Sequence, residues 1–148
     1  MENIKDRFIF DLPGEWEDQT VYHFRGPRLG DTEHMVRLTL DRNLQHDEIK
    51  SFATEKSNPI KNQAQNIEVL KDKEVTIEGG YPVWEFIYKW VMADDLVTYH
   101  KYVFVIAGKL GFTFSCDFTK KTFKILGLQI QDLVDSVVPG SYTPIEEE

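Results

Sequence analysis

The sequence predicts an α+β domain built on an antiparallel sheet, and three patterns support this fold class. Several stretches alternate apolar and polar residues with the period of two that is typical of strands. These stretches are residues 19–25, 34–41, 81–92, 96–107 and 110–118. The short connections between the last three are typical of hairpins, which make neighbouring strands antiparallel. Two other stretches, 46–66 and 120–138, repeat apolar residues at helical spacing instead.

The N-terminal part of the chain predicts a short strand and a turn before the alternating stretches. The sequence "RFIFDLPGEW" indicates a strand over residues 7–12 that ends in a Pro13-Gly14 turn. After two further strands, the first helix is predicted from the apolar residues Ile49, Phe52, Ala53 and Ile60, with acidic residues in its first turn. We expect Asn58-Pro59 to break or kink this helix, because proline clashes with the carbonyl four residues back.

The stretch between this helix and the three long strands is rich in lysine and poor in apolar residues. It covers residues 67–80 and ends in Gly79-Gly80, which is typical of a turn. Lysine protects exposed strand edges from further pairing. We therefore expect an edge strand here.

A final helix is predicted to follow the last strand and to close the domain. Thr119 is a suitable N-cap, because its hydroxyl can accept a hydrogen bond from a free backbone N–H of the first turn. The apolar stripe of this helix consists of Phe123, Leu126, Ile130, Leu133 and Val137. Pro139-Gly140 ends the helix. We expect one domain over residues 1–140 and a flexible acidic tail over residues 141–148.

The composition restricts the classes of partner. The 148 residues carry a formal net charge of −8, the pI is near 5.0, and no basic stripe is visible, which argues against a nucleic-acid partner. The N-terminal sequence lacks the apolar segment of a signal peptide, and no run approaches the roughly 20 apolar residues of a membrane span. We therefore expect a cytoplasmic protein that is not integral to a membrane.

No pattern of catalytic or metal-binding residues is present, so we expect neither an enzyme nor a cofactor. The four histidines have no metal-type spacing, and Asp94-Asp95 is expected to be a solvated turn. The single cysteine, Cys116, is on the core-facing side of its strand, which indicates a structural thiol and excludes an internal disulfide. Phosphate loops and nucleophile elbows are missing as well.

The last hairpin assigns side chains to the two faces of the sheet. A tight Gly108-Lys109 turn would pair Val105 with Phe112 and Val103 with Phe114, so that these residues face the final helix. A register that differs by one residue would exchange the two faces. Extending the first register by one hairpin, we expect Trp84, Phe86, Tyr88 and Trp90 to join Phe112 and Phe114 in the core under the final helix.

The second face then collects apolar, aromatic and hydrogen-bonding side chains. We expect it to consist of Val21, His23, Arg37, Thr39, Glu85, Ile87, Lys89, His100, Tyr102, Phe104, Thr113 and Ser115, and Met35 can extend it. One interpretation is an ordinary half-solvated sheet face, because exposed apolar residues are common. The other is a binding surface, because large exposed apolar patches usually mark partner sites. On the second interpretation, Ile87→Asp or Phe104→Asp would spare the fold and weaken binding.

The sequence also resembles the DcrB-like domain family along most of its length. "FDLPGEWEDQTVYHF", with Trp16, Asp18 and Thr20, is similar to the opening of that family. "EVTIEGGYPVWEFIYKW" and "YHKYVFVIAGKLGFTFSC" are similar to its glycine turn, long strand and aromatic hairpin, although His100 and Tyr102 stand where the family often has glutamine. The resemblance implies a PsbP-like sandwich, a curved antiparallel sheet with helices packed on one face.

Within that family the chain looks like the effector-associated (Eag) chaperones of type VI secretion. This resemblance implies a homodimer that shields the hydrophobic N-terminal transmembrane segments of a toxin effector before export. The twelve residues of the second face would then bind the client. The alternative is a small-ligand or regulatory binding module of the same fold, which would require an enclosed pocket with convergent polar groups.

Overall fold

The computed structural model of the chain describes residues 13–16, 20–26, 28, 34–42, 44–63, 65–77, 80–91 and 96–136. The strand expected at residues 7–12, Asp94-Asp95, Val137, Pro139-Gly140 and the tail over 141–148 lie outside these residues. The expected Pro13-Gly14 turn lies within them. In this turn the Trp16 amide donates a hydrogen bond to the Pro13 carbonyl oxygen at 2.9 Å.

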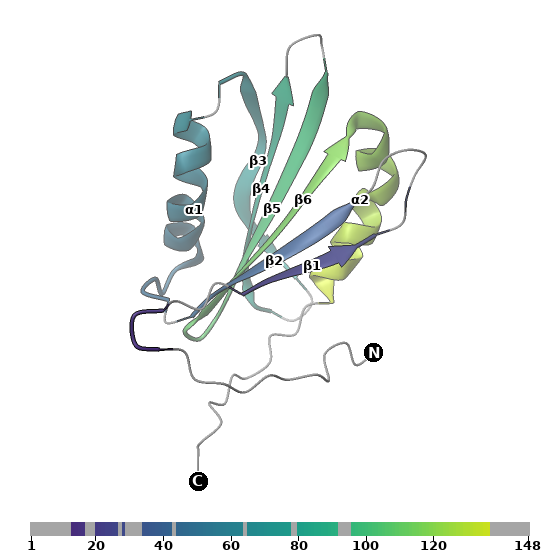
Figure 1. Cartoon of the computed structure of the whole chain (residues 1–148). Helices are drawn as coiled ribbons and strands as arrows, with labels where there is room; N and C mark the ends of the chain where they lie inside the picture. The colour runs from purple at the N-terminus through teal and green to yellow at the C-terminus, as the bar shows by residue number, and fades with distance from the viewer. Residues whose placement is uncertain are drawn as a thin grey trace.

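The described elements form a six-stranded antiparallel sheet and two helices, which confirms the predicted α+β class (Figure 1). In chain order they are β1 (Val21–Arg25), β2 (Met35–Asp41), α1 (Ile49–Gln63), β3 (Ile67–Thr76), β4 (Pro82–Val91), β5 (Val97–Ala107), β6 (Leu110–Thr119) and α2 (Lys120–Asp135). The strand order is β1-β2-β6-β5-β4-β3, so β3 is an edge strand as expected. Its ladder with β4 shifts register between Val69 and Lys71.

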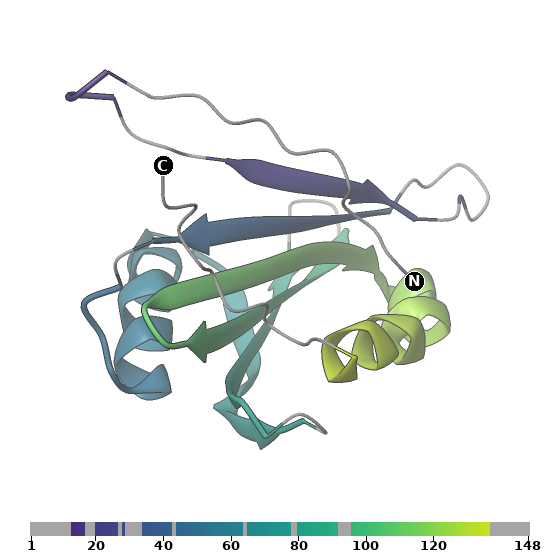
Figure 2. The same cartoon turned by 90° about the horizontal axis from the view of Figure 1, so that it is seen from below.

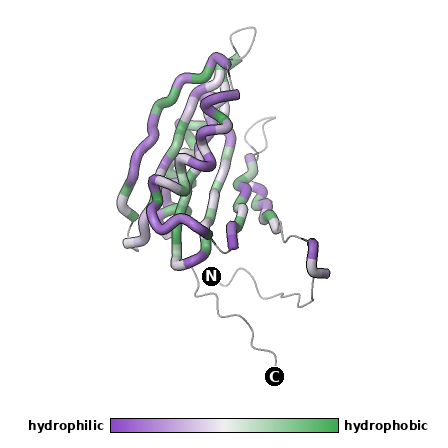
Figure 3. The backbone as a smooth tube through the Cα atoms, turned by 90° about the vertical axis from the view of Figure 1, so that its left-hand side faces the viewer, coloured by the Kyte–Doolittle hydropathy of each residue, from purple (hydrophilic) through white to green (hydrophobic). Residues whose placement is uncertain are grey.

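The two helices pack on opposite faces of the sheet, so the expectation that they share one face is wrong (Figures 1 and 2). Phe52 of α1 packs with Phe104, whose side chain leaves β5 on one face. Val134 of α2 packs with Val103 and therefore lies on the other face, because neighbouring residues of a strand point in opposite directions. Each face of the sheet therefore carries an apolar cluster under its helix. Figure 3 shows both hydrophobic and hydrophilic residues along the strands.

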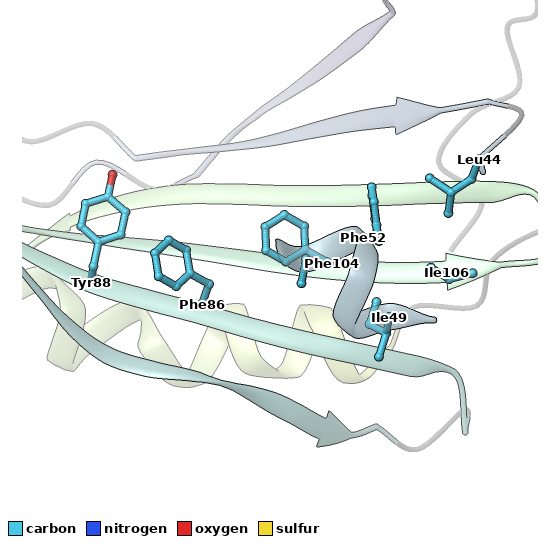
Figure 4. Packing of buried hydrophobic residues seen from close by; sticks show 8 residues of the cluster. Leu44, Ile49, Phe52, Phe86, Tyr88, Phe104 and Ile106 are labelled. Carbon is cyan, nitrogen blue, oxygen red and sulfur yellow. The ribbon is translucent and has the colours of Figure 1, made fainter. Parts of the chain in front are cut away.

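The α1 core lies between this helix and β4–β5 (Figure 4). Ile49, Phe52 and Ala53 supply the helix side, as their helical spacing predicts. Gly111 of β6 provides the room: a Cβ added there would lie 2.8 Å from Cζ of Phe52. Pro59 lies inside α1, which continues to Gln63, so the expected break does not occur. The expected acidic first turn is also missing, because α1 begins only at Ile49.

The start of α2 agrees with the sequence prediction. The Thr122 amide donates to Thr119 Oγ1 at 3.2 Å, and the Thr119 amide donates to Thr122 Oγ1 at 2.9 Å. This reciprocal capping box satisfies two backbone donors that a helix N-terminus otherwise leaves free.

The predicted register of the last hairpin is confirmed, but its extension to β4 is wrong. Val105 pairs with Phe112 and Val103 with Phe114 around Gly108, whose φ is +62°. The next hairpin pairs Trp84 with Phe104, so the even-numbered residues of β4 face α1.

The aromatic side chains of β4 are therefore not under α2. Phe86 and Tyr88 belong to the α1 core, Trp84 packs against its edge, and Trp90 is 38% exposed. Phe112 and Phe114 are only partly buried, and they do lie against α2 as predicted.

Candidate functional site

Nine of the twelve predicted binding residues share the face of the sheet that α1 partly covers. Eight of them form two rows across four neighbouring strands. In strand order β5-β6-β2-β1 the rows are Phe104, Thr113, Thr39 and Val21, and then Tyr102, Ser115, Arg37 and His23. His100 pairs with Asp117 one row further along.

The other three predicted residues lie on the α2 face, which corrects the sequence-based grouping. Glu85, Ile87 and Lys89 alternate with the aromatic residues of β4, and β4 is inverted relative to the prediction. Glu85 is 2% exposed, and Ile87 is buried as well. Neither is available to a partner on the opposite face.

Phe104 lies on the predicted face but beneath α1. It is fully buried, and its ring contacts that of Phe52 edge-on at a centroid distance of 5.7 Å. The expectation that Phe104→Asp or Ile87→Asp would spare the fold is therefore at odds with the burial of both side chains, because a carboxylate there would be desolvated without a partner.

Part of this face has no helix over it among the described residues. We call it the open face, and it consists of Val21, His23, Met35, Arg37, Thr39, Trp90, His100, Tyr102, Thr113, Ser115 and Asp117. Helix α1 lies mainly over β3, β4 and β5 and reaches only the Gly111 end of β6 and the Asp41 end of β2, whereas the open face extends over the rest of β6, β2 and β1 (Figures 1 and 2). Three apolar side chains of the open face, Val21, Met35 and Trp90, are between 38% and 42% exposed.

Stacked rings form the border between the α1 core and the open face. The His100 ring stacks on Tyr88 at 4.7 Å, and Tyr102 stacks on Tyr88 at 6.3 Å. His100 is fixed on both sides: Nδ1 lies 2.6 Å from Asp117 Oδ1, and Nε2 lies 2.9 Å from Thr98 Oγ1. The border is thus a rigid aromatic wall with few free torsions.

The two tyrosines of this wall stay protonated. Burial is the main cause that raises the pKa of Tyr88, and the neighbouring Tyr102 adds to it. Burial also raises the pKa of Tyr102, and the Asp117 charge acts in the same direction while Arg37 opposes it. Both phenols can therefore donate a hydrogen bond at neutral pH.

Arg37 lies in the second row, between Ser115 and His23. Its exposed guanidinium and the Asp117 carboxylate put charges of both signs on the open face. Because neighbouring strands are about 4.8 Å apart, the four strands from β5 to β1 give a floor about 15 Å wide. An α-helix with its side chains is about 10–12 Å across, so one helix fits on this floor.

The described residues contain no cluster of side chains that could hold a metal ion, and their one cysteine is buried. No group of three or more histidine, cysteine, aspartate or glutamate residues is placed to bind a metal among them. Cys116 is buried in the core under α2, and burial raises the pKa of its thiol to about 12. None of the helices in the described part of the chain is both long and apolar enough to cross a membrane.

Sequence reasoning missed Trp90 and Tyr88 as residues of this site, because it placed them in the core under α2. The strand pattern alone does not contain the missing information, which is the register between β4 and β5. Gly111 is a usable signal: a glycine beside Thr113 and Ser115 indicates that something approaches that face closely.

No protein-family model matches the sequence, and no curated protein matches it. The resemblance to the DcrB-like family is therefore not supported by a family match. Among solved structures, the chain is similar to PA94 from Pseudomonas aeruginosa, a protein of unknown function that is suggested to be a regulator. The TM-score is 0.71 at 15% identity, over 87% of this chain and 89% of PA94. This similarity shows a shared fold.

A second solved structure, CalU16 from Micromonospora echinospora, matches less well. It is 12% identical over 85% of this chain and 88% of CalU16, with a TM-score of 0.37. A score this low adds nothing to the assignment of the fold.

Proposed function

We propose that the chain is a non-enzymatic binding protein whose open face holds an apolar helical segment of a partner protein. The observation that carries the proposal is the part of the two cross-strand rows that α1 leaves uncovered, with Val21, Met35 and Trp90 exposed at its margins. A floor about 15 Å wide accommodates a helix but does not enclose a small ligand. Exposed apolar side chains supply burial, and the hydroxyls of the rows can bond polar positions of the helix.

The resemblance to Eag chaperones makes the proposal more specific. The client would be the hydrophobic N-terminal region of a type VI secretion effector, kept from aggregating until export. A transmembrane helix in water exposes apolar surface that costs roughly 1.5–3 kcal/mol per large side chain. A chaperone that covers one side of such a helix removes much of this cost.

A regulatory binding module is the second candidate, and it is favoured by the fold shared with PA94, which is suggested to be a regulator. Such a module would respond to a small ligand. Native mass spectrometry of the purified protein separates the two candidates, because a regulator isolated with its ligand has a defined additional mass.

The test of the chaperone uses a helical probe of about 20 apolar residues with a small-xxx-small motif, fused to a soluble carrier. The unmodified chain should keep the probe soluble on co-expression and bind it in a pull-down. Met35→Asp should weaken binding about tenfold or more, because the added carboxylate would be desolvated against the probe.

The matched control is Val91→Asp. Val91 is 37% exposed, close to the 42% of Met35, and ends β4 on the opposite face of the sheet. Circular dichroism should show both variants folded. Equal binding by the two variants would refute the assignment of the client to the open face.

A further inference from the structure

Helix α2 carries a second apolar stripe that faces away from the sheet. The side chains of Ile125 and Leu128 are on its outer surface, 48% and 76% exposed. Lys121 and Asp132 continue the same line at either end and are exposed as well. The spacing of four, three and four residues places all four on one side of the helix. We call these four residues the α2 stripe.

The charges of α2 are reversed relative to the helix dipole. Lys120, Lys121 and Lys124 lie near the N-terminal end, where the dipole favours negative charge. Asp132 and Asp135 lie near the C-terminal end, where it favours positive charge. Each placement is mildly unfavourable within an isolated helix. In the described part of the chain neither Lys121 nor Asp132 forms an ion pair that would offset this cost.

The α2 stripe is complementary to itself about a two-fold axis. In an antiparallel pair of α2 helices, an axis that places Ile125 against Leu128 of a second copy also places Lys121 against Asp132 of that copy. Both pairings have the same midpoint in the sequence, so a single axis serves them, as an isologous contact requires. The basic end of each helix then lies beside the acidic end of the other.

We propose that the α2 stripe is the interface through which two copies of this chain form a homodimer. The spacing is that of a coiled-coil seam, which favours helices crossing at about 20°. The contact covers only about three helical turns, so it is smaller than a standard stable interface and predicts a weak dimer. The dimer leaves the open face free, because α2 and the open face lie on opposite sides of the sheet. The proposal therefore does not depend on what the open face binds.

The test is an exchange of charges followed by analytical ultracentrifugation over roughly 1–300 μM protein, a range that spans micromolar dissociation constants. The unmodified chain should dimerise within this range. Lys121→Asp and Asp132→Lys should each raise the dissociation constant about tenfold, because each creates two like-charge contacts. The double variant Lys121→Asp/Asp132→Lys restores both pairs and should return the dissociation constant to within about threefold of the original.

Two further variants control for fold and for net charge. Lys50→Asp changes the net charge by the same amount as Lys121→Asp but lies on the exposed side of α1, and it should leave dimerisation unchanged. Leu128→Asp should abolish dimerisation while circular dichroism stays unchanged, because this side chain is 76% exposed. A monomer at every concentration overturns the proposal, as does a dimer that survives Leu128→Asp. Failure of the double variant to recover overturns the antiparallel register.

Discussion

Replacing Glu85 should destabilise the fold more than any other single charge removal on the α2 face. Glu85 lies 2.6 Å from Lys71 Nζ and 3.8 Å from Lys101 Nζ, and its side chain is 2% exposed. In Glu85→Ala the Lys101 ammonium, whose side chain is 7% exposed, keeps only its hydrogen bond to Gln131 Oε1 at 3.2 Å. Removing one partner of a buried pair typically costs about 3–5 kcal/mol, because the other charge is left uncompensated.

The lower end of that range is expected here. Lys71 is 34% exposed, so its ammonium can turn to water when Glu85 is lost, and only Lys101 is stranded. We therefore expect a loss of about 3 kcal/mol from the free energy of unfolding. Urea unfolding followed by tryptophan fluorescence should show this as a midpoint lowered by roughly 1–2 M.

The chain offers a matched control for this measurement. Glu68 pairs with Lys89 at 3.2 Å on the same two strands, but its side chain is 63% exposed. Glu68→Ala should cost less than about 1 kcal/mol, because exposed ion pairs contribute little. If Glu85→Ala and Glu68→Ala shift the midpoint equally, the buried pair is not structural and the reasoning fails.

Two substitutions and one alkylation experiment test the packing further. Phe104→Ala should cost about 3–5 kcal/mol in chemical unfolding, and a loss below 1 kcal/mol would mean that α1 does not cover this ring. Gly111→Ala should lower the free energy of unfolding by about 1–3 kcal/mol, since its Cβ would lie 2.8 Å from the Phe52 ring. Combining it with Phe52→Leu should recover part of this free energy, and no recovery would exclude the clash. Cys116 should resist alkylation at pH 8 until the protein unfolds. Because burial raises its pKa from 9.0 to about 12, its contribution to stability is complete below about pH 9 and lost as the pH rises toward 12; rapid native alkylation would contradict this.

The sequence predicts individual elements well because their signals are local. The capping box at Thr119 and the turn at Gly108 depend on a few neighbouring residues, and both are present. The Gly108-Lys109 turn also fixes the register of β5 with β6, because a two-residue hairpin leaves no freedom in pairing.

The face of β4 could not be read in the same way. The connection from Val91 to Val97 is longer and allows more than one register, and both sides of β4 contain large apolar residues. A shift of one residue in the pairing of β4 with β5 exchanges the two faces of β4. The wrong register therefore places Glu85 at the surface and Trp90 in the core. The apolar stripe of α1 requires a sheet face of its own, and a fold with one helix on each face satisfies both helices.

The candidate site was predicted in part for the same reason. Residues of β1, β2, β5 and β6 come together because their registers follow from short connections or clear alternation, as Arg37 and Ser115 show. The three predicted residues of β4, Glu85, Ile87 and Lys89, do not join them, because their placement depended on the one ambiguous connection. Burial of Phe104 also could not be seen, since it depends on where α1 lies.

The sheet also acts as a partition between two layers that meet only through its backbone. The rings around Phe52 and Phe104 lie on one side, and Val103 and Val134 lie on the other. Substitutions on the two sides should therefore combine additively, because the side chains share no contacts. A protein built in this way can change what it recognises on one layer while the packing of the other, and any assembly that depends on it, is inherited unaltered.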